Sequence, residues 1–98
     1  MSTTYDLLRT AHQEARVVHA VYHDKTRIFE VRSLGHTEGV ERCHAFQFNL
    51  EPPDWRCFNV EEIHEASLGS PLSDYPAATE ERQQGCVATP DPALHQHQ

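Results

Sequence analysis

Short apolar and aromatic runs, separated by turn-forming residues, fill the middle of this chain and limit what it can fold into. β-branched and aromatic residues favour strands, and each run is too short for an ordinary helix. The pattern therefore predicts five short antiparallel strands, at residues 17–22, 26–31 or beyond, 43–50, 55–58 and 63–68.

The segments between these runs have the composition of turns. His23-Asp24-Lys25 predicts a hairpin turn, residues 35–39 a polar loop whose glycines permit positive φ, and residues 59–62 a tight turn. Pro52 and Pro53 end the third strand because neither can donate to a sheet. Five strands joined by such short loops are too many for one flat sheet to bury well. We therefore expect a small five-stranded β-barrel, whose closure removes exposed edges.

Helical signals flank the strands. A threonine cap followed by apolar residues at helical spacing predicts an N-terminal helix of about three turns. A cap at Ser73 or Asp74, with Pro76 in the first turn, predicts a short C-terminal helix that ends at Gly85. The expected class is mainly β (α+β), with one domain over residues 1–84 and a disordered tail over residues 85–98.

Composition limits the function. The net charge of −7 argues against a general phosphate-binding surface, because sequence-independent nucleic-acid affinity comes mainly from Lys and Arg. Any nucleic-acid contact would need a local basic patch. The chain has no apolar run long enough to span a bilayer, and residues 1–6 lack the pattern of a signal peptide. We expect a cytoplasmic protein without a membrane partner.

The cysteines and histidines give no strong chemical motif. Three widely spaced cysteines suit reduced thiols better than a disulfide framework. Structural zinc sites usually show Cys-x-x-Cys or comparable spacing, which is missing here, so we expect no metal and no cofactor. Cys57 and His64 are the one pair of nucleophile and base expected on adjacent strands, and strand cysteines in small barrels are more often inert. We expect no catalytic residues.

The same runs resemble the WYL-domain family, in particular its short members, over about residues 11–84. The segment Tyr75-Pro76 and the helical pattern after it also look like the C-terminal trailer of that family. The residues that carry the resemblance are Tyr22, Arg27, Glu30, Leu34-Gly35, Ala45-Phe46-Gln47, Trp55-Arg56 and the segment 58–63.

The resemblance implies an SH3-like barrel of the kind that senses a ligand or nucleic acid within transcriptional regulators. Guanidinium groups bind anions bidentately, and an exposed tryptophan can stack on bases. The leading hypothesis is a non-enzymatic sensor or regulatory module that binds a small anionic ligand or a short single-stranded nucleic acid. The candidate binding residues are Arg27, Arg32, Arg42, Trp55 and Arg56.

Two alternatives remain open at this point. Arg27 and Arg32 could instead form cross-strand pairs with acidic residues at positions 30, 41 or 65, with Trp55 filling the thin core. The second functional hypothesis is a protein-interaction or dimerisation barrel that binds no nucleic acid. Its partner surface would use Phe46, Phe48 and Trp55, or the strand edges.

Overall fold

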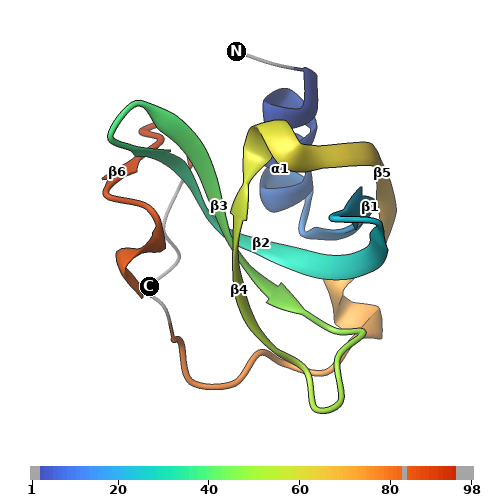
Figure 1. Ribbon diagram of the computed structural model, residues 1–98. Coiled ribbons are helices and arrows are strands. Elements are labelled where there is room, and N and C mark those ends of the chain that lie inside the picture. Colours follow the sequence, from blue (N-terminus) through green and yellow to red (C-terminus); the bar gives the residue numbers. More distant parts are fainter. Residues whose placement is uncertain (1–2, 83, 95–98) are drawn as a thin grey trace.

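The computed structural model describes residues 3–82 and 84–94 (Figure 1). Within these residues, no helix is long and apolar enough to cross a bilayer. The elements in chain order are α1 (Thr3–Glu14), β1 (Arg16–Tyr22), β2 (Lys25–Thr37), β3 (Val40–Gln47), β4 (Asp54–Asn59), the 3-10 turn η1 (Val60–Glu62), β5 (Ile63–Pro71), the 3-10 turns η2 (Leu72–Asp74) and η3 (Gln84–Cys86), and β6 (Thr89–Pro90).

The described strands form one antiparallel sheet in the order β4-β3-β2-β1-β5, and β6 pairs with β2 away from this path. The prediction of a mainly β chain is confirmed. The path is open, with β4 and β5 at its two ends, so a closed barrel is not observed. The predicted N-terminal helix is present as α1 and contributes three buried side chains to the core.

Two tight turns set the β1–β2 and β2–β3 hairpins of this sheet. His23 and Asp24 have φ values of 51° and 64°, and Glu38 and Gly39 have 51° and 80°. Positive φ at both central residues is the signature of type I′ turns, whose twist matches that of the flanking strands. The turn predicted at residues 23–25 is confirmed at His23 and Asp24, while Lys25 already opens β2. The loop predicted at 35–39 is wrong, because β2 continues to Thr37 and leaves only Glu38 and Gly39 outside the strands.

An inner core lies between α1 and one face of the sheet. Three side chains of α1 are fully buried there, at 0–1% exposure, because they recur at helical spacing on one face. The members of this inner core are Tyr5, Leu8, Ala11, Val18, Ala20, Tyr22, Phe29, Val31, Leu34, Cys43, Ala45, Phe58, Val60, Ile63 and Leu94.

A second buried cluster lies on the opposite face of the sheet. Successive strand side chains point to opposite faces, so His44 and Phe46 face away from the Cys43 and Ala45 side chains of the inner core. Phe46 pairs with Trp55 across β3 and β4, and the two rings meet at 5.1 Å. We call His44, Phe46 and Trp55 the outer cluster. Five consecutive residues of β3, from 43 to 47, are consequently buried.

The outer cluster is covered by the C-terminal strap, defined as residues 75–82 and 84–94. In Figure 1 this orange-to-red segment passes from the end of β5 to β6. The C-terminal helix predicted after Pro76 is wrong, since residues 76–82 have no regular secondary structure. That stretch lacks an apolar stripe that a helix could bury, and the backbone carbonyl of Glu80 instead accepts a hydrogen bond from Trp55.

The strap ends packed against the sheet and α1. We expected disorder from residue 85, but Thr89 and Pro90 pair with β2, and Leu94 is 6% exposed in the inner core. The approach of β6 requires a glycine on β2, because a Cβ on Gly35 would lie 2.1 Å from the carbonyl oxygen of Thr89. Residues 95–98 of the predicted tail lie outside the described residues.

A disulfide joins Cys57 of β4 to Cys86 of the strap. Their Cα atoms are 5.7 Å apart, within the range that such bridges span. The prediction of reduced thiols is therefore wrong for these two residues. It holds for Cys43, which is unpaired and fully buried.

Candidate ligand cavity and disulfide

The five residues predicted to bind a ligand are divided between the two faces of the sheet. Arg27 contacts the inner-core side chains of Tyr22 and Phe58. Arg56 lies opposite Ala45, an inner-core residue, and is therefore on the inner face as well. The remaining three, Arg32, Arg42 and Trp55, lie on the outer side beneath the strap. The structure therefore does not bring the four arginines and the tryptophan together in one groove.

Arg27 closes one end of the inner core. Its Nη1 donates to Gln47 Oε1 at 3.3 Å and its Nη2 to the Tyr22 carbonyl oxygen at 3.2 Å. Its guanidinium carbon lies 5.5 Å from the centroid of the Tyr22 ring and 5.9 Å from that of Phe58. Such cation–π contacts and satisfied donors give Arg27 a packing role. Its partners differ from the acidic residues that the alternative interpretation proposed.

Trp55 is a core residue and only 2% exposed. Its indole stacks on His44 with centroids 4.8 Å apart, and its Nε1 donates to the Glu80 carbonyl oxygen at 2.9 Å. A nucleobase needs an exposed ring face for stacking, which Trp55 does not offer while the strap is in place. The alternative in which Trp55 fills the core is the arrangement observed.

A cavity of about 340 Å³ lies between the outer cluster and the strap. It contains one cationic and two acidic side chains, with Trp55 as its aromatic wall. Part of the cavity is formed by the strap itself. The lining residues are Glu30, Arg32, Trp55, Ala78, Thr79 and Glu81.

Arg32 is the cationic residue that lines this cavity. Its Nε donates to Glu81 Oε1 at 3.4 Å, and the Arg32 side chain is 37% exposed. Among the residues that the structure describes, neither Nη atom of Arg32 has a hydrogen-bond partner. Because only Nε of this guanidinium is engaged, its two Nη groups remain available to bind a carboxylate or phosphate.

The two carboxylates of the cavity differ in their surroundings. Glu81 is shared, because its Oε2 lies 3.2 Å from His44 Nδ1 while its Oε1 accepts from Arg32. Glu30 is half-buried, and this burial raises its pKa, although the nearby Arg32 and His12 act in the opposite direction. The cavity therefore offers a cationic donor beside a partly desolvated acid.

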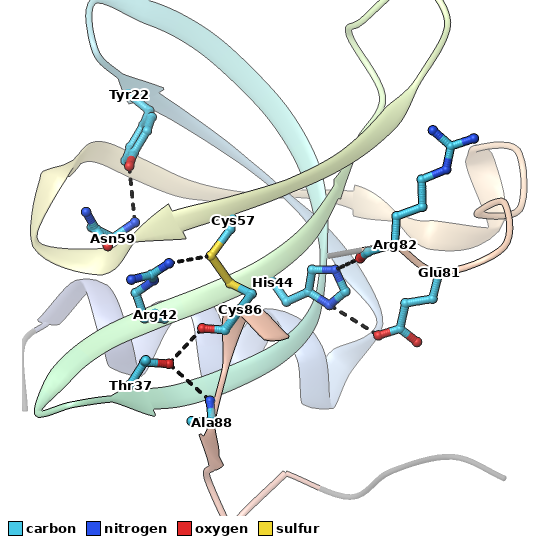
Figure 2. The surroundings of a disulfide bond; sticks show 10 residues. All are labelled: Tyr22, Thr37, Arg42, His44, Cys57, Asn59, Glu81, Arg82, Cys86 and Ala88. Atoms are coloured by element: carbon cyan, nitrogen blue, oxygen red, sulfur yellow. Dashed lines mark hydrogen bonds and ion pairs between the residues drawn. A yellow bond between two sulfur atoms is a disulfide. The ribbon is translucent and has the colours of Figure 1, made fainter. Parts of the chain in front are cut away.

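The disulfide lies further along the same face (Figure 2). Arg42 Nη2 points at Cys57 Sγ at 3.1 Å. The Nε atom of Arg42 is buried and is unpaired within residues 3–82 and 84–94. On the strap side, Thr37 Oγ1 donates to the Cys86 carbonyl oxygen at 2.8 Å and accepts from the Ala88 N–H at 3.0 Å.

Other chemistry suggested by the sequence is not assembled. Cys57 is bonded to Cys86 and so cannot act with His64 as a nucleophile and base. No group of three or more His, Cys, Asp or Glu side chains suited to a metal ion occurs in the described part of the chain. Sequence reasoning missed Glu81 and Cys86, because the strap that places them has no periodic pattern. It also missed the role of His44, a β3 residue whose partners Glu81 and Arg82 belong to the strap.

A smaller cavity of about 300 Å³ lies at the end of the strap, beside Tyr5, Arg9, His36 and Asp91. The carboxylate of Asp91 accepts hydrogen bonds from Tyr5 and Arg9. The charged groups of this cavity, Arg9 and Asp91, are therefore paired with each other. We therefore assign this region to the attachment of the strap rather than to ligand binding.

No protein-family model matches this chain, and comparison with curated proteins and with solved structures gave no match either. The likeness to the WYL-domain family accordingly stays a prediction from the residues. A functional assignment for this chain therefore rests on the contacts of Arg32 and of the disulfide.

Proposed function

We propose that this chain is a non-enzymatic, WYL-like regulatory module that binds a small anionic ligand in the cavity between the outer cluster and the strap, which we call the outer cavity. The observation that carries the proposal is the position of Arg32, which lines a cavity of about 340 Å³ together with Trp55 and whose two Nη atoms have no hydrogen-bond partner among the described residues. Ligand cavities typically combine apolar walls with a few polar groups that fix the ligand's orientation, and their volumes begin near this size.

The strand arrangement supports the fold part of the proposal. The order β4-β3-β2-β1-β5 is a four-strand meander whose fifth strand returns to β1 after the 3-10 turn η1. This order is compatible with the SH3-like barrel that the WYL resemblance implies. Regulation of transcription and a cytoplasmic location remain part of the proposal on the same basis.

The charges in the cavity narrow the ligand class. The Arg32 guanidinium suits a carboxylate or phosphate, and Glu30 beside it disfavours a ligand that is anionic throughout. A ligand with an anionic group next to an amine or another hydrogen-bond donor would satisfy both side chains. We therefore favour a small zwitterion or a donor-bearing anion over a single-stranded nucleic acid.

Calorimetric titration tests this assignment with four probe sets: α-amino acids, simple carboxylates, nucleoside monophosphates and short oligonucleotides. We expect heat of binding with a donor-bearing small anion, weakening as salt increases and at least tenfold weaker in Arg32→Gln, since a charge-assisted hydrogen bond contributes roughly 1.5–3 kcal/mol. Arg16→Gln is the matched control, because Arg16 contacts Glu14 and Gly69 instead of the cavity. Absence of binding by every set, or equal affinity in Arg32→Gln, would refute the proposal.

The aromatic side chains that the protein-interaction hypothesis assigned to a partner surface are packed against other parts of the chain. Phe46 and Trp55 are 1% and 2% exposed, and Phe48 packs against Tyr75 with centroids 4.7 Å apart. Val40 is the exposed large apolar side chain of the described residues. Light scattering on the titrated samples separates the two functions. A dimer that forms without ligand and survives Arg32→Gln would favour the interaction hypothesis.

A further inference from the structure

The contacts around the disulfide extend beyond the needs of a structural bridge. Arg42 directs a charged donor at Cys57 Sγ, a neutral sulfur in the bridged state (Figure 2). Its buried Nε has no partner among the residues described, and an unsatisfied buried donor is costly. A negatively charged sulfur at Cys57 would be a much better partner for this guanidinium than the bridged sulfur is.

We propose that Cys57–Cys86 is a redox site that exchanges with dithiols, and that its reduction releases the strap from the outer cluster. The substrate class is a dithiol reductant of the kind that keeps cellular thiols reduced. In compartments where thiols are reduced, disulfides are usually transient and take part in sensing or catalysis.

The exchange proceeds in two displacements. A thiolate of the dithiol attacks Cys86 Sγ, forming a mixed disulfide and expelling Cys57 as a thiolate beside Arg42. The second thiol of the reductant, as its thiolate, then displaces Cys86, which leaves as a thiolate and takes up a proton. Two electrons pass to the protein, and the reductant leaves as its own disulfide.

Arg42 determines which of the two cysteines leaves first as a thiolate. A nearby guanidinium stabilises a thiolate, and a stabilised thiolate is the better leaving group. In the reverse reaction the same thiolate is the nucleophile that re-forms the bridge. Cys86 is only 5% exposed, so a reductant reaches its sulfur when residues 84–88 move outward.

Besides the disulfide, the strap between Tyr75 and Cys86 is held only by noncovalent contacts. These include the Arg32–Glu81 ion pair, the Thr37 bond to the Cys86 carbonyl oxygen and the ring contact of Tyr75 with Phe48. The described polar anchors of this segment to the outer cluster include the Trp55 bond to the Glu80 carbonyl oxygen and the His44 contacts with Glu81 and Arg82. Residues 76–82 are mainly exposed and have no regular secondary structure. Segments of this kind open at low free-energy cost once a covalent anchor is lost.

The remainder of the strap has independent anchors. β6 pairs with β2, and Asp91 is bound by Tyr5 and Arg9 of α1. Reduction is therefore expected to open residues 75–82 and 84–86 while residues 89–94 stay attached. Because Ala78, Thr79 and Glu81 line the outer cavity, reduction would also weaken ligand binding, a consequence that rests on the proposed function.

The single tryptophan of the chain reports the opening directly. Trp55 fluorescence and hydrogen exchange are measured before and after dithiothreitol, with the 2 Da mass gain of reduction monitored in parallel. We expect a red shift of Trp55 emission and faster exchange in residues 75–82 and 84–86, with β1 to β3 unchanged. The double variant Cys57→Ser/Cys86→Ser should show the shifted emission from the start and no response to dithiothreitol.

Either of two results would overturn the proposal: resistance of the native protein to excess dithiothreitol, or complete reduction without a change at Trp55 and in the strap. Neither readout involves a ligand, so failure of the cavity assignment leaves this test intact. Ligand titration of the reduced protein then examines the coupling separately.

The role of Arg42 is tested by alkylation of the reduced protein at pH 7. We expect Cys57 to react about tenfold more slowly in Arg42→Gln, the size of effect that loss of an adjacent cation produces on a thiolate population. Arg56→Gln is the matched control, because it removes the same charge from the neighbouring residue on the other face of β4. Equal rates in the two variants would remove Arg42 from the mechanism.

Discussion

The hydroxyl of Tyr5 donates a hydrogen bond of 2.9 Å to the Asp91 carboxylate, 86 positions further along the chain. The same oxygen, Asp91 Oδ2, accepts from Arg9 Nη2 at 2.8 Å. One carboxylate thus fastens the end of the strap to two residues of α1. This attachment is independent of the disulfide, which fastens the strap to β4.

Removing the charge at this attachment should destabilise the protein. We expect Asp91→Asn to lower the free energy of unfolding by about 1–3 kcal/mol, because an amide replaces a charged acceptor of two side-chain hydrogen bonds. Asp24→Asn is the control, since Asp24 is exposed in a turn with φ of 64° that asparagine also adopts. Urea denaturation of both variants measures the difference, and equal losses would contradict the assigned role.

The same contacts predict how stability depends on pH. The pKa of Asp91 is lowered although burial raises it, because hydrogen bonds from the Ala93 N–H, Arg9 and Tyr5 favour the ionised form. Its contribution is therefore present above the unfolded pKa, near 3.8, and is lost as pH falls through the folded value. Burial and the hydrogen bond to Asp91 raise the pKa of Tyr5 to about 12. Its contribution is present below pH 10 and lost as pH rises towards about 12.

Urea unfolding measured from acidic to alkaline pH checks both the loss of stability at low pH and the loss at high pH. Asp91→Asn should show a smaller loss of stability below pH 4 than the parent protein, because the titrating group is gone. Tyr5→Phe should likewise lose less stability above pH 10. Unchanged pH profiles in both variants would place the titrating groups elsewhere.

The close approach of β6 to β2 predicts a sharp difference between two glycines. A Cβ on Gly35 would meet the Thr89 carbonyl oxygen at 2.1 Å, whereas a Cβ on Gly85 has nothing within 4 Å. We expect Gly35→Ala to cost about 1–3 kcal/mol and to expose the end of the strap, and Gly85→Ala to stay within about 0.5 kcal/mol of the parent. Thermal unfolding and limited proteolysis measure both effects; a tolerant Gly35→Ala would argue against the pairing of β6.

The thiols should titrate in a fixed pattern. Cys43 is fully buried, which raises the pKa of its thiol, and the other two cysteines form the bridge. We expect no reaction of the oxidised native protein with Ellman's reagent, one reactive thiol after denaturation, and all three after reduction and denaturation. A fast-reacting thiol in the native oxidised protein would contradict this burial or pairing.

Trp55 is expected to tolerate loss of its polar atom better than loss of its volume. Trp55→Phe removes the Nε1 bond to Glu80 and should cost about 1 kcal/mol, whereas Trp55→Ala should cost about 3–5 kcal/mol. Tyr75→Phe is a useful control, because it keeps the ring contact with Phe48. Circular dichroism melts compare the three, and a mild Trp55→Ala would return Trp55 to the surface role that its sequence context suggested.

The strand positions were largely predictable because local physics determines them. β-branched and aromatic residues marked residues 17–22 as a strand, and His23-Asp24 marked a tight turn. The strap was not predictable in the same way. Its path depends on Trp55, His44 and β4, which lie far away in the sequence and leave no periodic signal in residues 76–82.

The candidate site shows the same division. Arg32 was identified from its residue type, and its place in the cavity was not, because Glu81 and Thr79 arrive from the strap. The pairing of Cys57 with Cys86 was missed for that reason too, since cysteine spacing cannot report how an irregular segment returns to a strand. The partners of Arg27 were not predictable either, because they are a backbone carbonyl and an amide, groups that carry no charge pattern.

The double burial of β3 places an unusual demand on side-chain size. When one face of a strand is exposed to solvent, the alternation of polar and apolar residues fixes its register. The five buried residues of β3 have no solvent-exposed face, so this signal is missing. Size replaces polarity here, since Cys43 and Ala45 are small and face the inner core, while His44 and Phe46 are large and face the outer cluster. A slip by one residue would force Phe46 into the space of Ala45. Gln47, the fifth buried residue, is polar and bonds to Arg27 and Asn49. Over residues 43–46, the alternation of small and large side chains therefore encodes the alignment of the sheet at its most enclosed strand.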